Sequence, residues 1–162
     1  MALNTDKEDV VQIIGFNVGE KLYGADILSI REILRDPVIE PVDKSPDFIE
    51  GIVRLRGEVI PIIDLTHRLA GGRLNGANGN KDWVLIAQSG GVTTGYVVDA
   101  VTHIHKIGAD TILPAPELIL AGLRSQYMRG VCDTEKGLLV VLDLDRMLVN
   151  DEIHAIRQLE LH

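Results

Sequence analysis

An internal repeat constrains the fold of this chain more than any other feature of its sequence. The segment Gly51–Leu65 aligns without a gap over Gly130–Leu144, which places Asp64 over Asp143. Two further matches lie upstream in the same order: Ile27–Ile33 over Val98–Ile104, and Gln12–Ile14 over Val84–Ile86. Single matches between apolar segments arise easily by chance, but three in one order indicate a duplicated unit. The matched segments are rich in Ile and Val, so the unit is predicted to be all-β.

The first copy of the repeated segment has the pattern of a β-hairpin. Ile52–Leu55 and Val59–Ile63 are rich in β-branched residues, and Arg56-Gly57-Glu58 separates them. Gly57 can adopt the positive φ that a tight reversal requires. Pro61 has no N–H to donate to a ladder, so we expect its strand to lie at a sheet edge or to carry a bulge.

Further strands are predicted at Val10–Phe16 and Leu22–Ile27. Residues 27–34 fit either the spacing of a helix or the pattern of a twisted strand. The corresponding part of the second copy, Tyr96–Ile104, is β-rich, which favours a strand in both copies.

Three short helices complete the expected elements. Ser45 and Pro46 are typical of an N-cap and a first helical position, so one helical turn is predicted over Ser45–Glu50. Asp64 is expected to cap a helix through Leu65–Leu69. The chain turns helical again from Asn150 onward, with an apolar stripe that should pack back onto the rest of the fold. The stripe consists of Ile153, Ile156 and Leu159.

These elements divide the chain into a disordered tail (1–9), a first subdomain (10–69), a linker (70–82), a second subdomain (83–149) and a C-terminal helix (150–162). The linker is predicted from its Gly and Asn content. Aromatic residues make up only 4% of the sequence, so the core must be built from Ile, Val and Leu. Each half alone would be marginally stable, and we expect the halves to share an interface.

Charge and composition exclude several classes of partner. The net charge of −8 argues against nucleic acid and against an anionic membrane surface. No apolar run approaches the roughly 20 residues that span a bilayer. A single cysteine, Cys132, cannot form an internal disulfide, which is consistent with a reducing, cytoplasmic compartment.

The sequence offers little chemistry for catalysis. None of its serines lies in a Gly-x-Ser-x-Gly elbow, and Gly71-Gly72 is not followed by the Gly-Lys-Ser/Thr of a phosphate-binding loop. His103 and His105 share one face of a strand, but a solvated face is favoured over a metal site. Cys132 is interpreted as a small core residue. No cofactor or metal is therefore expected, although a small ligand-binding barrel or enzyme stays an alternative.

Two charged residues suggest a binding surface instead. Glu32 lies between Ile30 and Ile33 in a predicted strand, and Arg56 lies at the tip of the predicted hairpin beside Gly57. Both charges could be ordinary solvated side chains. Arginine is nevertheless common in protein interfaces, because its planar guanidinium bonds bidentately and is weakly hydrated.

The sequence resembles the family of bacterial chemotaxis coupling proteins named CheW. The resemblance covers about residues 10–150 and is carried by six segments: Tyr23–Ile33, Pro46–Gly57, Val59–Leu65, Gly95–Val101, Pro114–Glu117 and Ser125–Gly130. It implies a fold of two SH3-like five-stranded barrels, which agrees with the duplication and with the C-terminal helix lying outside it. Arg54 departs from the family, where Asn is often found, and so does the glycine-rich linker.

The resemblance also implies a function. Members of the family are not enzymes, and they bridge the histidine kinase CheA, through its regulatory domain, to the cytoplasmic tips of membrane-bound chemoreceptors. Ile30, Glu32, Ile33, Arg56 and Gly57 match the positions tied to receptor contact, whereas the kinase-binding residues cannot be placed. The chain is too short for the kinase itself or for the related CheV proteins with their receiver domain. An adaptor of a pilus or other chemosensory array would have the same pattern.

Overall fold

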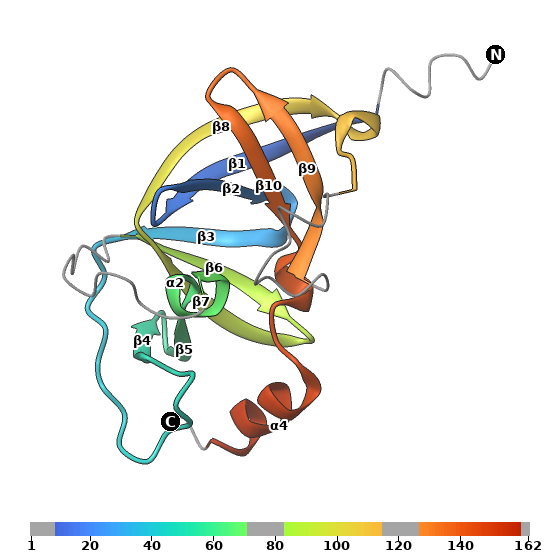
Figure 1. Ribbon diagram of the computed structural model, residues 1–162. Helices are drawn as coiled ribbons and strands as arrows, with labels where there is room; N and C mark the ends of the chain where they lie inside the picture. The colour runs from blue at the N-terminus through green and yellow to red at the C-terminus, as the bar shows by residue number, and fades with distance from the viewer. Residues whose placement is uncertain (1–8, 71–82, 115–126, 160–162) are drawn as a thin grey trace.

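The strands of this protein form two five-stranded sheets in the computed structural model (Figure 1). The structure describes residues 9–70, 83–114 and 127–159. The first sheet, called sheet one, has the order β8-β1-β2-β10-β9, and sheet two has the order β3-β6-β7-β5-β4. The strands are β1 (Val10–Val18), β2 (Lys21–Asp26), β3 (Ile30–Arg35), β4 (Gly51–Leu55), β5 (Glu58–Asp64), β6 (Trp83–Ser89), β7 (Val92–Val98), β8 (Ala100–Gly108), β9 (Met128–Thr134) and β10 (Gly137–Leu142). The helical elements are η2 (Ile27–Ser29), α2 (Leu65–Ala70), η4 (Ala109–Thr111), η6 (Leu144–Arg146) and α4 (Asn150–Gln158). The predicted all-β class with short helices and a C-terminal helix is confirmed.

The hydrogen-bonded registers confirm the duplication. In the parallel contact of sheet two, Ile62 of β5 pairs with Gly95 of β7. In sheet one, Val141 of β10 pairs with Gly24 of β2. Val141 is the repeat partner of Ile62, and Gly95 is the repeat partner of Gly24, so the two sheets are built to one pattern. The two hairpins β4–β5 and β9–β10 also pair in equivalent registers.

Each sheet draws its strands from both copies of the repeat. Sheet one combines β1 and β2 of the first copy with β8, β9 and β10 of the second, and sheet two has the reciprocal composition. The chain crosses between the sheets after β2, at η2, and again after β7. The predicted boundary at 70–82 therefore separates the two copies of the repeat but not the two sheets.

One of the upstream matches is wrong by one residue. Ile14 pairs with Ile104 in sheet one, and Leu85 pairs with Ile33 in sheet two. Since Ile33 and Ile104 are repeat partners, Ile14 corresponds to Leu85 and not to Ile86. An uninterrupted apolar run cannot fix the register, because side chains on both faces are hydrophobic and the period-two signal is lost.

Apolar side chains gather in three clusters. The largest lies between the sheets and contains residues of both, among them Phe16, Tyr23, Leu85 and Tyr96. The other two fill the individual sheets, and they are related by the repeat. They consist of Val53, Ile60, Ile62, Val84, Ile86 and Val97 in sheet two, and of Ile13, Cys132, Leu139 and Val141 in sheet one. The interface between the halves, predicted from their small size, is thus a shared core.

Three local predictions are corrected. Pro61 lies neither at a sheet edge nor at a bulge: its strand β5 is interior and pairs with β4 without a register shift. On the other side of β5, β7 pairs only from Ile62 onward, so the missing N–H of Pro61 removes no bond to β7. The strand predicted over residues 27–34 begins only at Ile30, because Asp26 accepts a hydrogen bond from Leu28 N (2.9 Å) and stabilises the turn η2. Ser45–Glu50 is not a helix: it contains a turn closed by Ile49 N and Pro46 O (3.0 Å), and the Ser45 hydroxyl donates to Val42 O (3.2 Å).

The helix predicted after the first hairpin is present, and a helical turn follows the second hairpin at the equivalent position. α2 follows Asp64, which is buried, and the capping role of Asp64 stays a prediction. Its repeat partner Asp143 caps η6, where the carboxylate accepts from Asp145 N (3.1 Å). The predicted tail up to residue 8, the linker from residue 71 to 82 and the last residues of the C-terminal helix lie outside the described residues.

Candidate protein-binding surface

The two charged residues singled out from the sequence form an ion pair. Arg56 donates from Nη1 to Glu32 Oε1 (2.5 Å) and from Nη2 to Glu32 Oε2 (3.1 Å). This fork joins β3 at one edge of sheet two to the tip of the β4–β5 hairpin at the other edge. The Arg56 side chain is 70% exposed and that of Glu32 is 25% exposed, so the pair lies at the surface.

The hairpin turn holds Arg56 in an uncommon backbone conformation. Leu55 pairs with Glu58, which leaves Arg56 and Gly57 as a two-residue loop. Their φ angles are 50° and 82°, as in a type I′ turn. The positive φ of Gly57 was predicted; that of Arg56 was not, because a non-glycine residue rarely adopts it. The turn restricts the backbone from which the guanidinium extends.

Two further ion pairs flank this one. Arg31 Nη2 lies 2.7 Å from Glu58 Oε1, and Arg54 Nε lies 3.0 Å from Glu40 Oε2. Together with Glu32–Arg56 they place three positive and three negative charges on β3, on the β4–β5 hairpin and at Glu40 beside β4. These two pairs could not be predicted from the sequence, since their members are 27 and 14 residues apart. Arg31 meets Glu58 because the sheet curls, and Arg54 meets Glu40 because Glu40 bridges to Ile52 of β4.

Glu32 and Arg56 each shift the pKa of the other in the direction that favours its charged form. The hydrogen bond from Arg56 lowers the pKa of Glu32, and the positive charges of Arg56 and Arg31 add to this effect. The same carboxylate raises the pKa of Arg56. The pair therefore stays ionised at neutral pH and presents a fixed arrangement of charge to a partner.

The remaining predicted site residues lie around the pair in different environments. Ile30 and Ile33 are half-buried and pack against the shared core, while Gly57 is exposed at the hairpin tip. A register shift in the β3–β6 pairing lies between Ile30 and Glu32. Only the exposed edges of the two isoleucines are open to a partner, so the charged pair dominates this surface.

The second copy of the repeat has different residues at the equivalent positions. His103 occupies the place of Glu32, and Glu135 and Lys136 occupy those of Arg56 and Gly57. The β9–β10 hairpin nevertheless forms in the same register as β4–β5. The fold of a sheet therefore does not require an Arg–Glu pair between its edge strand and its hairpin tip.

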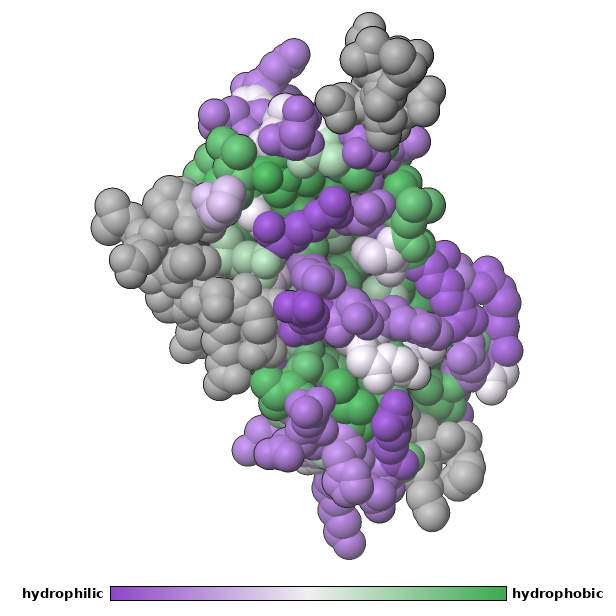
Figure 2. All heavy atoms as spheres, turned by 90° about the vertical axis from the view of Figure 1, so that its right-hand side faces the viewer, coloured by the Kyte–Doolittle hydropathy of each residue, from purple (hydrophilic) through white to green (hydrophobic). Residues whose placement is uncertain are grey.

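Several large hydrophobic side chains are exposed, and the sequence pattern had not singled them out. They are Val10, Leu28, Val38, Ile104, Leu113 and Leu138. Ile104 is the repeat partner of Ile33, and it borders Ile14 on β1. Figure 2 shows apolar patches interrupting the polar surface on the side of the molecule to which β9 and α4 belong. Apolar patches rimmed by polar residues are common at protein interfaces.

The histidines and the cysteine considered in the sequence analysis do not form a further site in the described part of the chain. The His103 and His105 rings are 6.5 Å apart. Among the described residues, no three His, Cys, Asp or Glu side chains come together as ligands for a metal ion. Cys132 lies in the core of sheet one, where burial raises the pKa of its thiol. None of the helices in the described part of the chain has the length and hydropathy needed to cross a membrane.

Comparison with known proteins gives one consistent result. The family model described as CheW-like domain matches residues 12–152. The chemotaxis protein CheW of Klebsiella aerogenes is 32% identical over 139 residues, which cover 85% of this chain and 81% of the relative. The chemotaxis protein CheW of Treponema pallidum is 28% identical over 161 residues, covering 98% and 92%. The crystal structure of the scaffolding protein TtCheW from Thermoanaerobacter tengcongensis superposes with a TM-score of 0.74 at 30% identity, covering 86% of this chain and 89% of that one.

Proposed function

The chain belongs to the CheW-like family, and from this membership we propose that it is the adaptor that couples chemoreceptor tips to the histidine kinase CheA. Membership makes it a non-catalytic scaffold of chemotaxis signalling. The finer proposal is that it acts in the cytoplasm, binds the regulatory domain of CheA, and binds the receptors through Glu32 and Arg56. An array serving pilus motility or another output is the alternative setting.

One observation carries the receptor site. The Glu32–Arg56 pair is exposed and bidentate, and the equivalent hairpin in sheet one forms without such a pair. A feature that one copy of a duplicated fold has, and the other lacks, is better explained by binding than by folding. Charge-assisted bonds from a guanidinium held at a tight turn order few additional side-chain torsions on binding.

An adaptor also needs a second surface for its second partner. The duplication supplies a candidate for this second surface. In sheet one, the edge strand β8 and the hairpin β9–β10 are equivalent to β3 and the β4–β5 hairpin of the proposed receptor site. Sheet one also exposes Val10, Ile104 and Leu138. The kinase-binding residues themselves are not assigned by these observations.

The test compares equivalent hairpin tips. Arg56→Ala should weaken binding of a receptor cytoplasmic fragment by roughly thirtyfold, as expected when a charged contact is lost from the middle of an interface. Glu32→Lys should damage binding of the same fragment. Lys136→Ala removes a cation from the other hairpin tip and should leave receptor binding unchanged. Calorimetric titration of each variant against the receptor fragment and against a kinase regulatory domain measures both affinities. Unchanged receptor affinity of well-folded Arg56→Ala would refute the site.

A further inference from the structure

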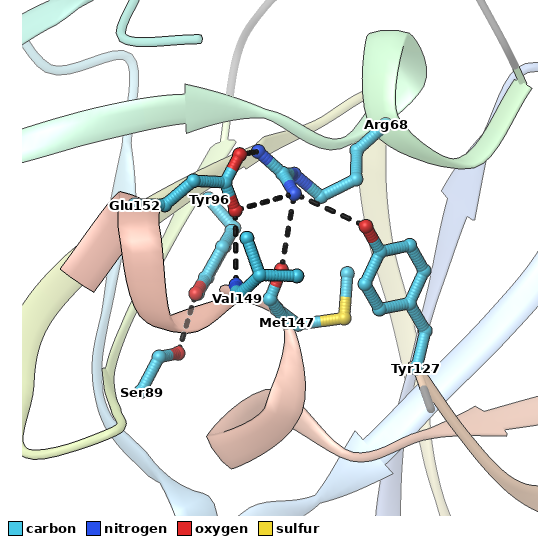
Figure 3. Close-up of polar contacts among 7 residues, drawn as sticks. All are labelled: Arg68, Ser89, Tyr96, Tyr127, Met147, Val149 and Glu152. Atoms are coloured by element: carbon cyan, nitrogen blue, oxygen red, sulfur yellow. Dashed lines mark hydrogen bonds and ion pairs between the residues drawn. The ribbon is translucent and has the colours of Figure 1, made fainter. Parts of the chain in front are cut away.

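A second Arg–Glu pair lies on a different part of the molecule and is largely buried. Arg68 of α2 donates from Nη1 to Glu152 Oε1 (3.0 Å) and from Nη2 to Glu152 Oε2 (2.6 Å) (Figure 3). The side chains are only 10% and 19% exposed. Unlike Glu32–Arg56, this pair is part of the interior, and no property of the proposed receptor site explains it.

Arg68 gathers contacts from several segments. Its Nη1 also donates to the Tyr127 hydroxyl (3.1 Å) and to Met147 O (3.2 Å). The guanidinium lies over the Phe48 ring at 5.8 Å and over the Tyr127 ring at 5.9 Å. Glu152, in turn, accepts a hydrogen bond from Val149 N (3.0 Å), so one carboxylate satisfies both the guanidinium and the first turn of α4. These contacts stabilise α4 only while it lies against α2.

The cluster lies where the two copies of the repeat meet. Arg68 and Met147 are repeat partners, and Arg68 donates to the carbonyl of its own counterpart. Leu65 and Leu69 of α2 pack in the same shared core as their partners Leu144 and Leu148. Since α2 continues from sheet two and η6 from sheet one, a bond from Arg68 to this region ties one sheet to the other.

Other donors of sheet two bind the same turn. Ser89 donates to Leu144 O, and Gly90 N donates to Asp145 O (3.2 Å). Ser89 also shares a hydrogen bond with the buried Tyr96 hydroxyl (Figure 3). The η6 turn is therefore fixed to sheet two by bonds that do not involve α4 or Glu152.

The helix α4 is attached less extensively. It comprises Asn150–Gln158, nine residues, which is too short for a stable helix in water without packing. Ile153, Ile156 and the C-cap residue Leu159, the three residues of the predicted stripe, pack against the shared core, and Arg157 Nη2 donates to Gly90 O (3.3 Å). Beyond these contacts the described part of the helix depends on Glu152. It also lies outside the repeat, so either sheet can be completed without it.

From this arrangement we propose that α4 is a latch, meaning a helix that detaches and docks again as a unit while both sheets stay intact. The Arg68–Glu152 pair sets the fraction of molecules in which α4 is docked, the closed state. Opening would expose the guanidinium of Arg68 and the apolar surface under Ile153 and Ile156 at the junction of the two sheets. The proposal goes beyond the adaptor function, because it concerns a conformational change and assigns no partner.

Native-state hydrogen exchange of the full chain tests this proposal. In the wild type, amides of α4 should exchange at least tenfold faster than those of β6 and β7. Glu152→Gln keeps the shape and can still accept from Val149 N, but it removes the charge opposite Arg68. It should accelerate exchange in α4 by about tenfold or more and leave β6 and β7 unchanged. The matched control, Glu58→Gln, neutralises the exposed pair with Arg31 and should leave α4 unchanged.

Two results would overturn the latch. If α4 exchanges at the rate of β6 and β7 in the wild type, helix and sheets form one cooperative unit. If Glu152→Gln alters all elements equally, or leaves α4 unaffected, the pair does not control the helix. Circular dichroism of each variant at the exchange temperature establishes that the comparison is made between folded proteins.

Discussion

Glu32 and Arg56 show how much about a binding surface can be predicted from single residues of the sequence. Both were recognised as candidates because a charge inside an apolar strand and an arginine at a hairpin tip are unusual. Their pairing could not be predicted, since β3 and β4 are the two edges of sheet two and meet only through its curvature. The positive φ of Arg56 was missed for a related reason: the alternative residue, glycine, was already present beside it.

The ionisation of Glu32 gives a prediction at this scale. The bond from Arg56 lowers the pKa of Glu32 in the folded state below its unfolded value. A lowered pKa means that the pair contributes to stability above the unfolded pKa, and that this contribution is lost as pH falls through the folded pKa. A pH titration followed by carboxyl-carbon NMR should find Glu32 titrating below an ordinary glutamate. In Arg56→Ala the midpoint should move up.

The outcome of that titration separates two interpretations of the surface. An identical midpoint in wild type and Arg56→Ala would mean that the pair is open in solution and that Arg56 is free to bind partners independently.

At the scale of elements, the sequence predicted what depends on neighbours along the chain. The β4–β5 hairpin and α2 were predicted correctly, because turn residues and β-branched runs act locally. Pro61 was misjudged because the pairing of β5 with its neighbour in space, β7, begins only at the following residue, Ile62. The Ser45–Glu50 turn was misjudged because Ser45 uses its hydroxyl as a donor to Val42 O rather than as a cap. Such choices are settled by tertiary contacts.

A glycine in each sheet makes room for side chains of the two neighbouring strands. A Cβ on Gly24 would lie 2.5 Å from Ile13 Cγ2 and 3.0 Å from Leu139 Cδ2, while one on Gly95 would lie 2.5 Å from Ile62 Cδ1 and 2.9 Å from Val84 Cγ1. Gly24→Ala should therefore destabilise the protein by about 1–3 kcal/mol, the usual cost of overpacking a core. Gly95→Ala should cost a similar amount. Urea denaturation of both variants measures the change in the free energy of unfolding. If either variant is as stable as the wild type, the side chains around that glycine can shift to accommodate a methyl group.

The whole molecule has an organisation that the repeat alone could not reveal. Alignment of the two copies shows which strands are equivalent, and it predicted two similar units correctly. It does not show which copy each strand pairs with, since both pairings satisfy the same pattern of side chains. Because consecutive strands are usually neighbours, division at the linker was the natural expectation. The crossings at η2 and after β7 instead exchange three strands of each copy.

This exchange predicts how the protein behaves when it is divided between residues 76 and 77, inside the predicted linker. The first fragment contains β1 and β2 of sheet one and β3, β4 and β5 of sheet two, so it can complete neither sheet, and the second fragment is in the same position. Each fragment would also expose its half of the shared core to water. Circular dichroism and NMR should find each fragment largely unfolded alone, because each keeps only two hairpins and one strand without its neighbour, and isolated two-stranded hairpins are marginal in water. Mixed in equal amounts, the fragments should regain the spectrum of the intact chain, with a midpoint of unfolding that rises with concentration. A fragment that gives a dispersed, cooperative spectrum by itself would contradict the reciprocal exchange, since it would have to pair its own strands into a complete sheet.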